Sequence, residues 1–421
     1  MKNLRFLYST AEAFPNHRVD LTELFSAGLA RRGHAIDWHR ELVDPSRGGT
    51  IEINENERVI GCHRIAGRSV LALLTNSLIV AWHDLRLLWL PRTGDYDFIQ
   101  VRDRAGAALL ALAGARIARR PFFYWMSFPH AEDSLFRAKD RSLGIPLWKR
   151  LLLYIRGVFS LKVLYRLVLP LADHVFVQSD RMKADVAARG IAPEKLTPVP
   201  MCIRWQAIST AQLSLPVDPW LRGRRLLVYA GTLVRGRRLD FLVQVMDRVR
   251  REFPDALLVF VGDGPARDVA FLEAAVRRFG VDENVRFVGF LSMDRAWGYI
   301  KAADVCLSPL PPSPILAPGT PTKVIEYLAI GRPVVASEHP DQGRILRESR
   351  AGILVPYDCE AWAKAIVRML GDPENATTMG RRGPPYVRAH RTYEELVPRL
   401  EVKYFELLGG LSPDRRECAS A

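Results

Sequence analysis

The chain has 421 residues, of which 48% are hydrophobic and 25% are charged. These values are typical of a globular protein, and the length exceeds one ordinary domain and suits about two or three. The formal net charge of +14 favours anionic partners: nucleic acid, an anionic membrane surface or a phosphorylated small molecule. The five cysteines are widely spaced and form no CxxC pair, so neither a zinc site nor a disulfide framework is predicted, and a reducing compartment is expected.

The N-terminus opens a strand–helix–strand pattern. Charged residues stand among the apolar ones in 1–8, which indicates a first strand rather than a signal peptide. A loop with Asn16 and His17, a helix over 19–32 and a strand at 34–38 follow. Because ligands bind at the carboxyl ends of strands in open α/β sheets, Asn16 and His17 are candidate site residues, although His17 could equally be a solvated surface histidine. The loop has no G-x-G-x-x-G, so the dinucleotide fingerprint is absent.

The alternation continues to residue 126. Residues 69–90 are strongly apolar with helical character, and they are followed by a strand at 97–102, a helix at 105–119 and a strand at 121–126. Ser127 and His130 come directly after this last strand and are site candidates; a turn with a solvated histidine is the alternative.

The segment from 141 to 170 holds six basic residues, several aromatic residues and no acidic residue. One interpretation is a surface that docks on anionic lipid headgroups. The other is a pair of core helices with basic side chains at the edge. Nucleic acid is not expected, because no RNA- or DNA-binding motif occurs. The longest uncharged run, 69–83, is shorter than the roughly twenty residues of a membrane span, so no transmembrane helix is predicted.

The second half of the chain repeats the α/β alternation. Residues 205–224 carry two prolines and no clear period, and are predicted to be an interdomain linker. Strands are then expected near 226–231, 256–262, 285–288, 305–308, 334–336 and 353–355, with a last helix at 393–408 and a flexible tail at 410–421. Continuous apolar strands that alternate with helices predict two parallel-sheet α/β domains facing a cleft.

Two stretches of the second domain are suited to anions. The loop 231–238 combines glycines with three arginines after a strand, and such a loop can hold a diphosphate. The stretch 319–336 predicts a loop, a helix with Thr320 as N-cap and Pro321 as first residue, and a buried strand. Its helix start offers N–H groups and a positive dipole to a phosphate, and Glu326, one turn after Thr322, suits ribose hydroxyls. The alternatives are a solvated basic turn and an ordinary capped helix.

At these residues the sequence resembles the family-4 retaining glycosyltransferases of the GT-B fold. Matching segments occur in order over both halves: 29–34, 177–179, 190–200, 229–231, 261–265, 285–291, 302–305 and 322–336. The resemblance implies two Rossmann-like domains: an acceptor domain at 1–204, the linker at 205–224, a nucleotide-sugar donor domain at 225–390, and a helix at 391–409 that packs back toward the first domain.

The resemblance also implies transfer of a sugar from a nucleotide-sugar, with retention of configuration, no cofactor and usually no metal. It matches Glu326 to the glutamate that holds the donor ribose, Arg237 to the cation that grips the diphosphate, and Leu291 to the backbone contact with the base. The expected donor-binding residues are Gly231, Thr232, Arg237, Gly262, Leu291, Gly319, Thr320, Thr322, Lys323 and Glu326, and the expected catalytic residues are His130, Arg237 and Glu326.

The sequence departs from the family at three places. Thr232 stands where an arginine is frequent, Pro318 replaces the first motif glutamate, and 12–17 replace a Gly-Gly loop. We therefore expect the backbone N–H groups of Gly319 and Thr320 to hold the donor sugar.

The predicted function is a retaining glycosyltransferase that acts on a lipid-linked or cell-envelope glycan, in the cytoplasm at the inner face of the membrane. The alternatives are a nucleotide-sugar epimerase of the same fold and a noncatalytic partner in glycan assembly. The pair of catalytic carboxylates that a glycoside hydrolase needs is not found in the sequence.

Overall fold

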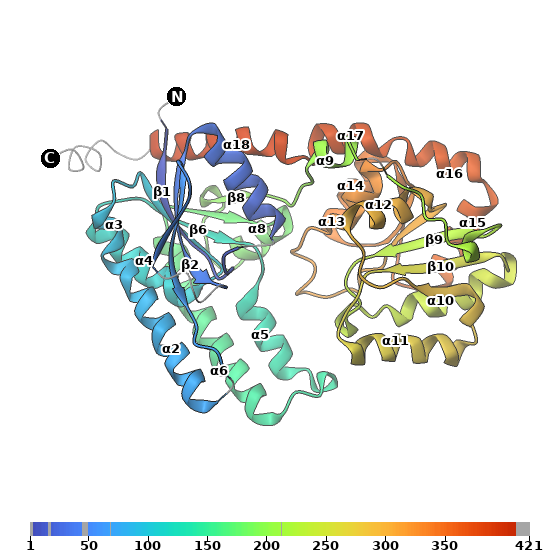
Figure 1. Cartoon of the computed structure of the whole chain (residues 1–421), viewed down its shortest axis with the longest axis horizontal. Helices are drawn as coiled ribbons and strands as arrows, with labels where there is room; N and C mark the ends of the chain where they lie inside the picture. The colour runs from blue at the N-terminus through green and yellow to red at the C-terminus, as the bar shows by residue number, and fades with distance from the viewer. Residues whose placement is uncertain (1–2, 16–17, 44–48, 68, 212, 410–421) are drawn as a thin grey trace. The chain divides into compact units, whose positions relative to one another are not determined.

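The computed structural model describes residues 3–15, 18–43, 49–67, 69–211 and 213–409 (Figure 1). The chain forms two compact units, Met1–Pro200 with Leu396–Ala421, and Met201–Glu395. Asn16 and His17, which the sequence predicts as site residues, and the predicted flexible tail 410–421 lie outside the described residues. No helix in the described ranges has the length and apolar character needed to cross a bilayer.

The first unit is built on an eight-stranded sheet in the order β3-β4-β2-β1-β5-β6-β7-β8. Neighbouring strands are parallel except for β3 and β4. The strands are β1 (Arg5–Ser9), β2 (Ala35–Leu42), β3 (Thr50–Asn54), β4 (Glu57–His63), β5 (Phe98–Arg102), β6 (Phe122–Met126), β7 (His174–Val177) and β8 (Leu196–Pro198). The chain moves outward in opposite directions from β1 and β5, so the topological switch point lies between these two strands.

Helices connect these strands. The segment predicted as one helix over 19–32 is helical throughout, as α1 (Val19–Leu21), a π-helical stretch (Thr22–Leu29) and a 3-10 turn (Ala30–Arg32). The others are α2 (Val70–Leu85), α3 (Leu90–Thr93), α4 (Ala105–Ile117), α5 (His130–Lys139), α6 (Leu147–Val163), α7 (Leu169–Leu171) and α8 (Asp180–Ala187).

The last helix, α18 (Tyr393–Gly409), joins the first unit from Leu396 onward. Its Tyr404 is fully buried, stacks on Phe98 with ring centroids 4.8 Å apart and bonds Gln100 at 2.8 Å. Glu401 accepts hydrogen bonds from Arg32 at 2.6 Å, and its other carboxylate oxygen lies 2.8 Å from His34. These contacts attach residues more than 300 positions apart in the sequence to one core.

The second unit contains a six-stranded parallel sheet in the order β11-β10-β9-β12-β13-β14. The strands are β9 (Arg225–Ala230), β10 (Ala256–Val261), β11 (Val285–Phe287), β12 (Val305–Ser308), β13 (Val334–Ser337) and β14 (Gly352–Val355). The helices are α9 (Trp205–Ser209), α10 (Asp240–Glu252), α11 (Ala266–Phe279), α12 (Met293–Ala302), α13 (Thr322–Ala329), α14 (Pro340–Ser349), α15 (Cys359–Gly371), α16 (Pro373–Gly380) and α17 (Gly383–His390). Here the switch point lies between β9 and β12.

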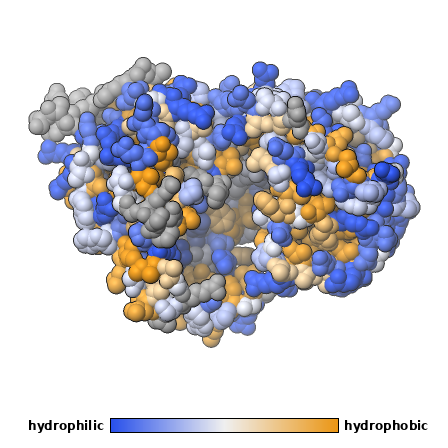
Figure 2. Space-filling view, in the orientation of Figure 1, coloured by the Kyte–Doolittle hydropathy of each residue, from blue (hydrophilic) through white to orange (hydrophobic). Residues whose placement is uncertain are grey.

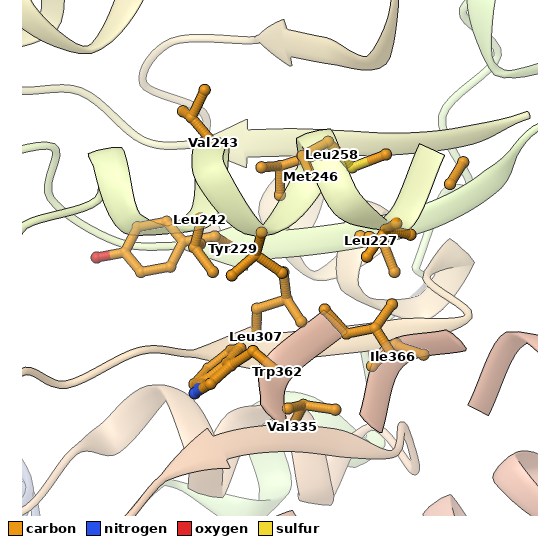
Figure 3. Close-up of a cluster of buried hydrophobic side chains, with 14 of the residues drawn as sticks. Leu227, Tyr229, Leu242, Val243, Met246, Leu258, Leu307, Val335, Trp362 and Ile366 are labelled. Atoms are coloured by element: carbon orange, nitrogen blue, oxygen red, sulfur yellow. The ribbon is translucent and has the colours of Figure 1, made fainter. Parts of the chain in front are cut away.

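One face of this sheet is covered by α10 and α15 (Figure 3). Trp362 of α15 is fully buried and meets Phe241 of α10 edge-on at 5.5 Å. Tyr229 of β9 belongs to the same cluster. Full burial of a large apolar side chain contributes about 1.5–3 kcal/mol, so this core holds β9 and the loop that follows it in a defined place.

Residues 205–224, which the sequence predicts to be a linker, lie within the second compact unit. Ile208 is 7% exposed in the core on the other face of the sheet, and Trp205 and Trp220 pack against that core. Apart from residue 212, which lies outside the described ranges, the stretch contains one five-residue helix and one 3-10 turn. Such short elements leave no periodic signal, although the tertiary structure buries their apolar side chains.

Candidate functional site

The candidate site of the second unit lies at its switch point. The loop 231–238 leaves the carboxyl end of β9, and α13 follows β12, the neighbouring strand. Gly231 has a φ of +145°, and a Cβ at this position would lie 3.3 Å from the Nζ of Lys323. A Cβ on Gly262 would in turn lie 2.1 Å from the carbonyl oxygen of Gly231. The two glycines therefore allow the loops after β9 and β10 to pack against each other and leave room for the lysine head.

Lys323 carries a buried positive charge into this site. Its side chain lies on the second residue of α13, is 8% exposed, and places Nζ 3.9 Å from the centroid of the Tyr229 ring. Burial, together with the charge of Arg237, holds the pKa of Lys323 well below its usual range, while Glu326 opposes that shift. A buried cation beside a second cation is unfavourable, and a bound anion would relieve the repulsion.

Arg237 is the loop arginine whose charge acts on Lys323. Its Nε donates to the hydroxyl of Thr232 at 3.1 Å. Arg235, in contrast, lies over the ring of Phe271 at 4.4 Å, and the carbonyl of Arg238 accepts from Tyr357. In the described part of the chain neither Arg237 nor Lys323 forms an ion pair with a carboxylate. The structure thus distinguishes Arg237 from the other two loop arginines, which the sequence pattern had grouped with it.

Glu326 lies one turn after Thr322 on α13 and is partly buried. Burial raises its pKa to about 7, and the nearby charge of Lys323 opposes this rise. A carboxyl group with a pKa near neutrality is well suited to exchange hydrogen bonds with hydroxyl groups in either protonation state.

The start of α13 differs from the prediction. The helix begins at Thr322 with Pro321 as its N-cap, so Thr320 is not the capping residue. The N–H of Gly319 donates to the carbonyl of Leu316 at 3.0 Å. That N–H is therefore engaged, and the expectation that it holds the donor sugar is not supported by this geometry. The reason is a tight turn before the helix, which sequence patterns did not reveal. The predicted helix end is correct, because Gly331 follows the C-cap with a φ of +80°.

Leu291 lies on the loop after β11 and packs partly buried against the core. Gly289, two residues before it, accepts the N–H of Gly262 at 2.9 Å. The loops after β9, β10 and β11, which carry Gly231, Gly262 and Leu291, are therefore linked at the carboxyl-terminal edge of the sheet.

The switch point of the first unit is occupied by paired charges. Arg102, at the end of β5, is 1% exposed and pairs with Asp20 at 2.6 Å and with Asp103 at 3.2 Å. Burial disfavours the ionised carboxylate of Asp20, but the positive charges of Arg102 and Arg18 outweigh this effect and lower the pKa of Asp20. Asp103 has a φ of +56° and accepts the N–H of Ser127 at 2.8 Å.

His130, the predicted catalytic histidine, begins α5 and its ring is half exposed. Its Nε2 lies 3.8 Å from a carboxylate oxygen of Asp103, which also accepts the hydroxyl of Ser127. The structure thus brings together the two candidates that follow β6 and adds Asp103, which sequence reasoning missed. Its position directly after β5 was the available signal. Tyr229 was also missed, because its role depends on a lysine 94 positions away.

Comparison with known proteins agrees with this two-unit organisation. Residues 224–372 match the model described as "Glycosyl transferases group 1", and residues 22–202 match the "Glycosyl transferase 4-like domain". The chain is 24% identical over 332 residues to a GDP-mannose-dependent phosphatidylinositol monomannoside mannosyltransferase of Mycobacterium tuberculosis, covering 76% of each chain. It is 24% identical over 166 residues to an alpha-D-kanosaminyltransferase of Streptomyces kanamyceticus, covering 39% of this chain and 41% of that protein.

Solved structures show the same fold. The sucrose-phosphate synthase of Thermosynechococcus elongatus aligns with a TM-score of 0.69 at 21% identity, over 97% of this chain and 100% of that one. Anabaena HepE in complex with UDP aligns with a TM-score of 0.68 at 14% identity, over 96% and 100%. The predicted fold class is confirmed, because the chain folds into two parallel-sheet α/β units. Both units match glycosyltransferase models, so the chain belongs to the GT-B glycosyltransferases of the family-4 type. It is a hexosyltransferase that uses a sugar donor.

Proposed function

We propose that this enzyme transfers a hexose from a nucleotide-diphosphate-sugar to a lipid-linked or cell-envelope glycan, with retention of configuration and with no metal requirement. The observation that carries the proposal is the pair of cations, Lys323 and Arg237, that meets at the glycine loop of Gly231 without a carboxylate partner among the described residues. The location supports it as well, because ligands of open α/β sheets bind at switch points.

In this proposal the donor diphosphate lies between Arg237, Lys323 and the first turn of α13. The positive end of the helix favours the same anion. Glu326 accepts from the ribose hydroxyls, and the loop at Leu291 contacts the base. HepE was solved with UDP, and the M. tuberculosis relative is named for GDP-mannose, so nucleotide donors occur among proteins of this fold and family.

The proposed reaction breaks the bond between the anomeric carbon and the diphosphate oxygen. The bonding electrons pass to the phosphate, where Arg237 and Lys323 stabilise the charge that develops in the transition state. The departing phosphate takes the proton of the acceptor hydroxyl, whose oxygen bonds the anomeric carbon on the same face. His130, whose ring lies 3.8 Å from Asp103, is proposed as a catalytic residue.

We further propose that residues 1–204 bind the acceptor and residues 225–390 bind the donor. The helix α6 supports a membrane-associated acceptor. Only Gly157 and Val163 of this helix are buried, whereas seven large apolar side chains are between 48% and 79% exposed: Leu147, Trp148, Leu151, Leu152, Tyr154, Ile155 and Phe159. The alternative of a core helix pair therefore fails for α6, whereas Leu164, Val168 and Leu169 at the end of the segment are buried in the core of the first unit. The helix also carries Lys149, Arg150, Arg156 and Lys162 with no acid, which suits an anionic membrane surface at the cytoplasmic face.

The test is donor turnover with a panel of UDP-, GDP- and dTDP-sugars, measured as release of the nucleoside diphosphate with and without membrane lipid extract. We expect release from one donor class and transfer of its sugar to lipid. Conversion of the donor to an epimer without release would instead identify an epimerase, and binding without turnover of any donor would contradict the proposed transfer.

A further inference from the structure

On the face of the second unit that Figure 2 shows, hydrophilic and hydrophobic side chains are intermixed, whereas a polar group with an unusual position lies in the interior of this unit. Tyr327 of α13 is fully buried. Its hydroxyl accepts the N–H of Ala230 at 2.8 Å and lies 3.5 Å from the carbonyl oxygens of Ala230 and Leu307. The side chain of a helix therefore ends between two neighbouring strands, β9 and β12.

The two strands separate at this point, which makes room for the hydroxyl. β9 stays paired with β10 up to Ala230, and β12 stays paired with β13 up to Ser308. The pairing of β9 with β12, in contrast, ends at Val228 and Cys306, two residues earlier on each strand. Backbone N–H groups in folded proteins nearly always have an acceptor. The hydroxyl of Tyr327 supplies one to Ala230 where the neighbouring strand has moved away.

The hydroxyl of Tyr327 is neutral at the pH of the cell. Burial raises its pKa well above the usual value for tyrosine. A neutral phenol both accepts and donates a hydrogen bond. The group that accepts from Ala230 therefore keeps a proton for the carbonyl oxygens beside it, and the contact spans the gap between β9 and β12.

The strand that Tyr327 contacts leads directly into the loop of the donor site. Ala230 is the last residue of β9 and is followed by the loop 231–238. In that loop the hydroxyl of Thr232 accepts a hydrogen bond from the Nε of Arg237 at 3.1 Å. Only one residue separates Ala230 from Thr232, so a displacement of Ala230 displaces the partner of Arg237.

The helix that carries Tyr327 also carries the second cation. Lys323 lies one turn earlier on α13, and its Nζ would lie 3.3 Å from a Cβ at Gly231. The hydroxyl of Tyr327 therefore connects the helix of Lys323 with the strand that leads to Arg237. Since Tyr327 and Lys323 belong to the same helix, this hydrogen bond constrains the separation of the two cations.

We propose that Tyr327 is a positioning residue for the donor diphosphate, because its hydroxyl holds β9 and α13 at the separation at which Arg237 and Lys323 contact the two phosphates together. This inference rests on the proposed donor site and deepens it, since it names the contact that fixes the two cations relative to each other. Charges that stabilise a transition state are effective when they are held in place before the reaction, and a misplacement of about 1 Å costs roughly 10²-fold in rate.

The experiment compares the affinities for nucleoside diphosphates and monophosphates by calorimetric titration, with UDP, UMP, GDP and GMP as probes. The wild type should bind the diphosphate of one base more tightly than its monophosphate, since two cations meet two phosphates. Tyr327→Phe keeps the ring and removes only the hydroxyl. The ratio of the two affinities should then fall roughly 10- to 100-fold, as the loss of one charge-assisted contact predicts. A loss of stability alone lowers the amount of folded protein and leaves this ratio unchanged.

Tyr299→Phe is the matched control. Tyr299 of α12 is buried in the same core as Tyr327, and its hydroxyl donates to a carboxylate oxygen of Asp218 at 2.5 Å. This bond is made to the segment 205–224 and not to a strand of the sheet. Tyr299→Phe should therefore lower the melting temperature by a few degrees and keep the wild-type preference for the diphosphate.

Hydrogen exchange of the backbone N–H of Ala230 tests the contact itself. Mass spectrometry of a peptide that covers β9 should show one amide that exchanges roughly tenfold faster in Tyr327→Phe than in the wild type or in Tyr299→Phe, because this amide loses its acceptor. If Tyr327→Phe does not fold, Tyr229→Phe takes its place in the titration. It removes the bond from the hydroxyl of Tyr229 to the carbonyl of Thr232 at 3.3 Å and should lower the same affinity ratio.

A diphosphate preference that survives in the folded variant would overturn this inference and leave the donor site intact, and so would unchanged exchange of the Ala230 amide. An equal loss of preference in Tyr299→Phe would also overturn it, because any buried hydroxyl of this core would then have the same effect. A wild type that binds diphosphates no better than monophosphates would overturn the donor site and this inference together. Failure of the inference is therefore distinct from failure of the proposed function.

Discussion

The two sheets place different electrostatics at equivalent positions. At the switch point of the first unit, the buried guanidinium of Arg102 is paired with Asp20 and Asp103. At the switch point of the second unit, the buried ammonium of Lys323 has an aromatic ring below it and another cation nearby, and no ion pair among the described residues. The first arrangement stabilises its own fold. The second is unfavourable until an anion binds, which is a property of a ligand site rather than of a structural core.

The largest effect, a loss of folding stability, is expected from removing an ion-pair partner at the switch point of the first unit. Asp20→Ala removes the 2.6 Å partner of an arginine that is 1% exposed. Loss of one partner of a buried pair costs about 3–5 kcal/mol, and the remaining contact to Asp103 favours the lower end. Urea denaturation followed by a first-unit probe measures this loss. Asp20→Asn keeps a hydrogen-bond acceptor and should lose less; equal stability of wild type and Asp20→Ala would refute a structural role.

At the switch point of the second unit, where the buried cation has no ion pair among the described residues, a substitution should affect donor turnover and not folding. Arg237→Met removes the cation that Thr232 orients at 3.1 Å. Because one fixed group that stabilises developing charge contributes about 10²–10³-fold in kcat, turnover of the donor should fall by that amount. The control is Arg235→Met, whose side chain lies over Phe271 and should leave turnover near the wild-type value. Similar losses in both variants would show that general loop charge matters, and not the position of Arg237.

Lys323→Met sharpens the contrast, because affinity and stability should change in opposite directions. Methionine fills a similar volume against Tyr229 and removes an unpaired buried charge. We expect the affinity for the nucleoside diphosphate to fall roughly 10- to 150-fold, as for a charge-assisted contact of about 1.5–3 kcal/mol. The melting temperature of the free enzyme should stay the same or rise. Calorimetric titration and thermal unfolding measure the two quantities, and a lower melting temperature with unchanged affinity would contradict the assignment.

The smallest effect concerns pH. Burial raises the pKa of Glu326 from 4.5 to about 7, so the folded protein binds this proton more tightly than the unfolded chain. The contribution of this group is therefore fully favourable below about pH 4.5 and is lost as the pH rises toward 7. Thermal unfolding from pH 5 to pH 8 should show a smaller decline in Glu326→Gln than in the wild type. Glu252→Gln, at an exposed position on α10, should keep the wild-type slope.

Much of the fold could be predicted because each buried strand is a continuous run of apolar residues, and in each helix the apolar residues recur with the helical period. The prediction missed residues 205–224, since their short elements have no period, and it placed the cap of α13 at Thr320 instead of Pro321. For the site, the sequence indicated which loops follow which strands. It could not separate Arg237 from Arg235, because that difference depends on Phe271, a residue of another helix.

The sequence by itself determined the two α/β units, the excess of basic residues and the stretches 231–238 and 319–326 that carry the candidate donor residues. These properties are local: they depend on apolar runs, glycines and charges that are neighbours along the chain. Only the tertiary structure decided which charges are paired, because burial and distance arise from elements far apart in sequence. It paired Arg102 with Asp20, placed Lys323 on Tyr229 without an ion pair among the described residues, and inserted the hydroxyl of Tyr327 between β9 and β12.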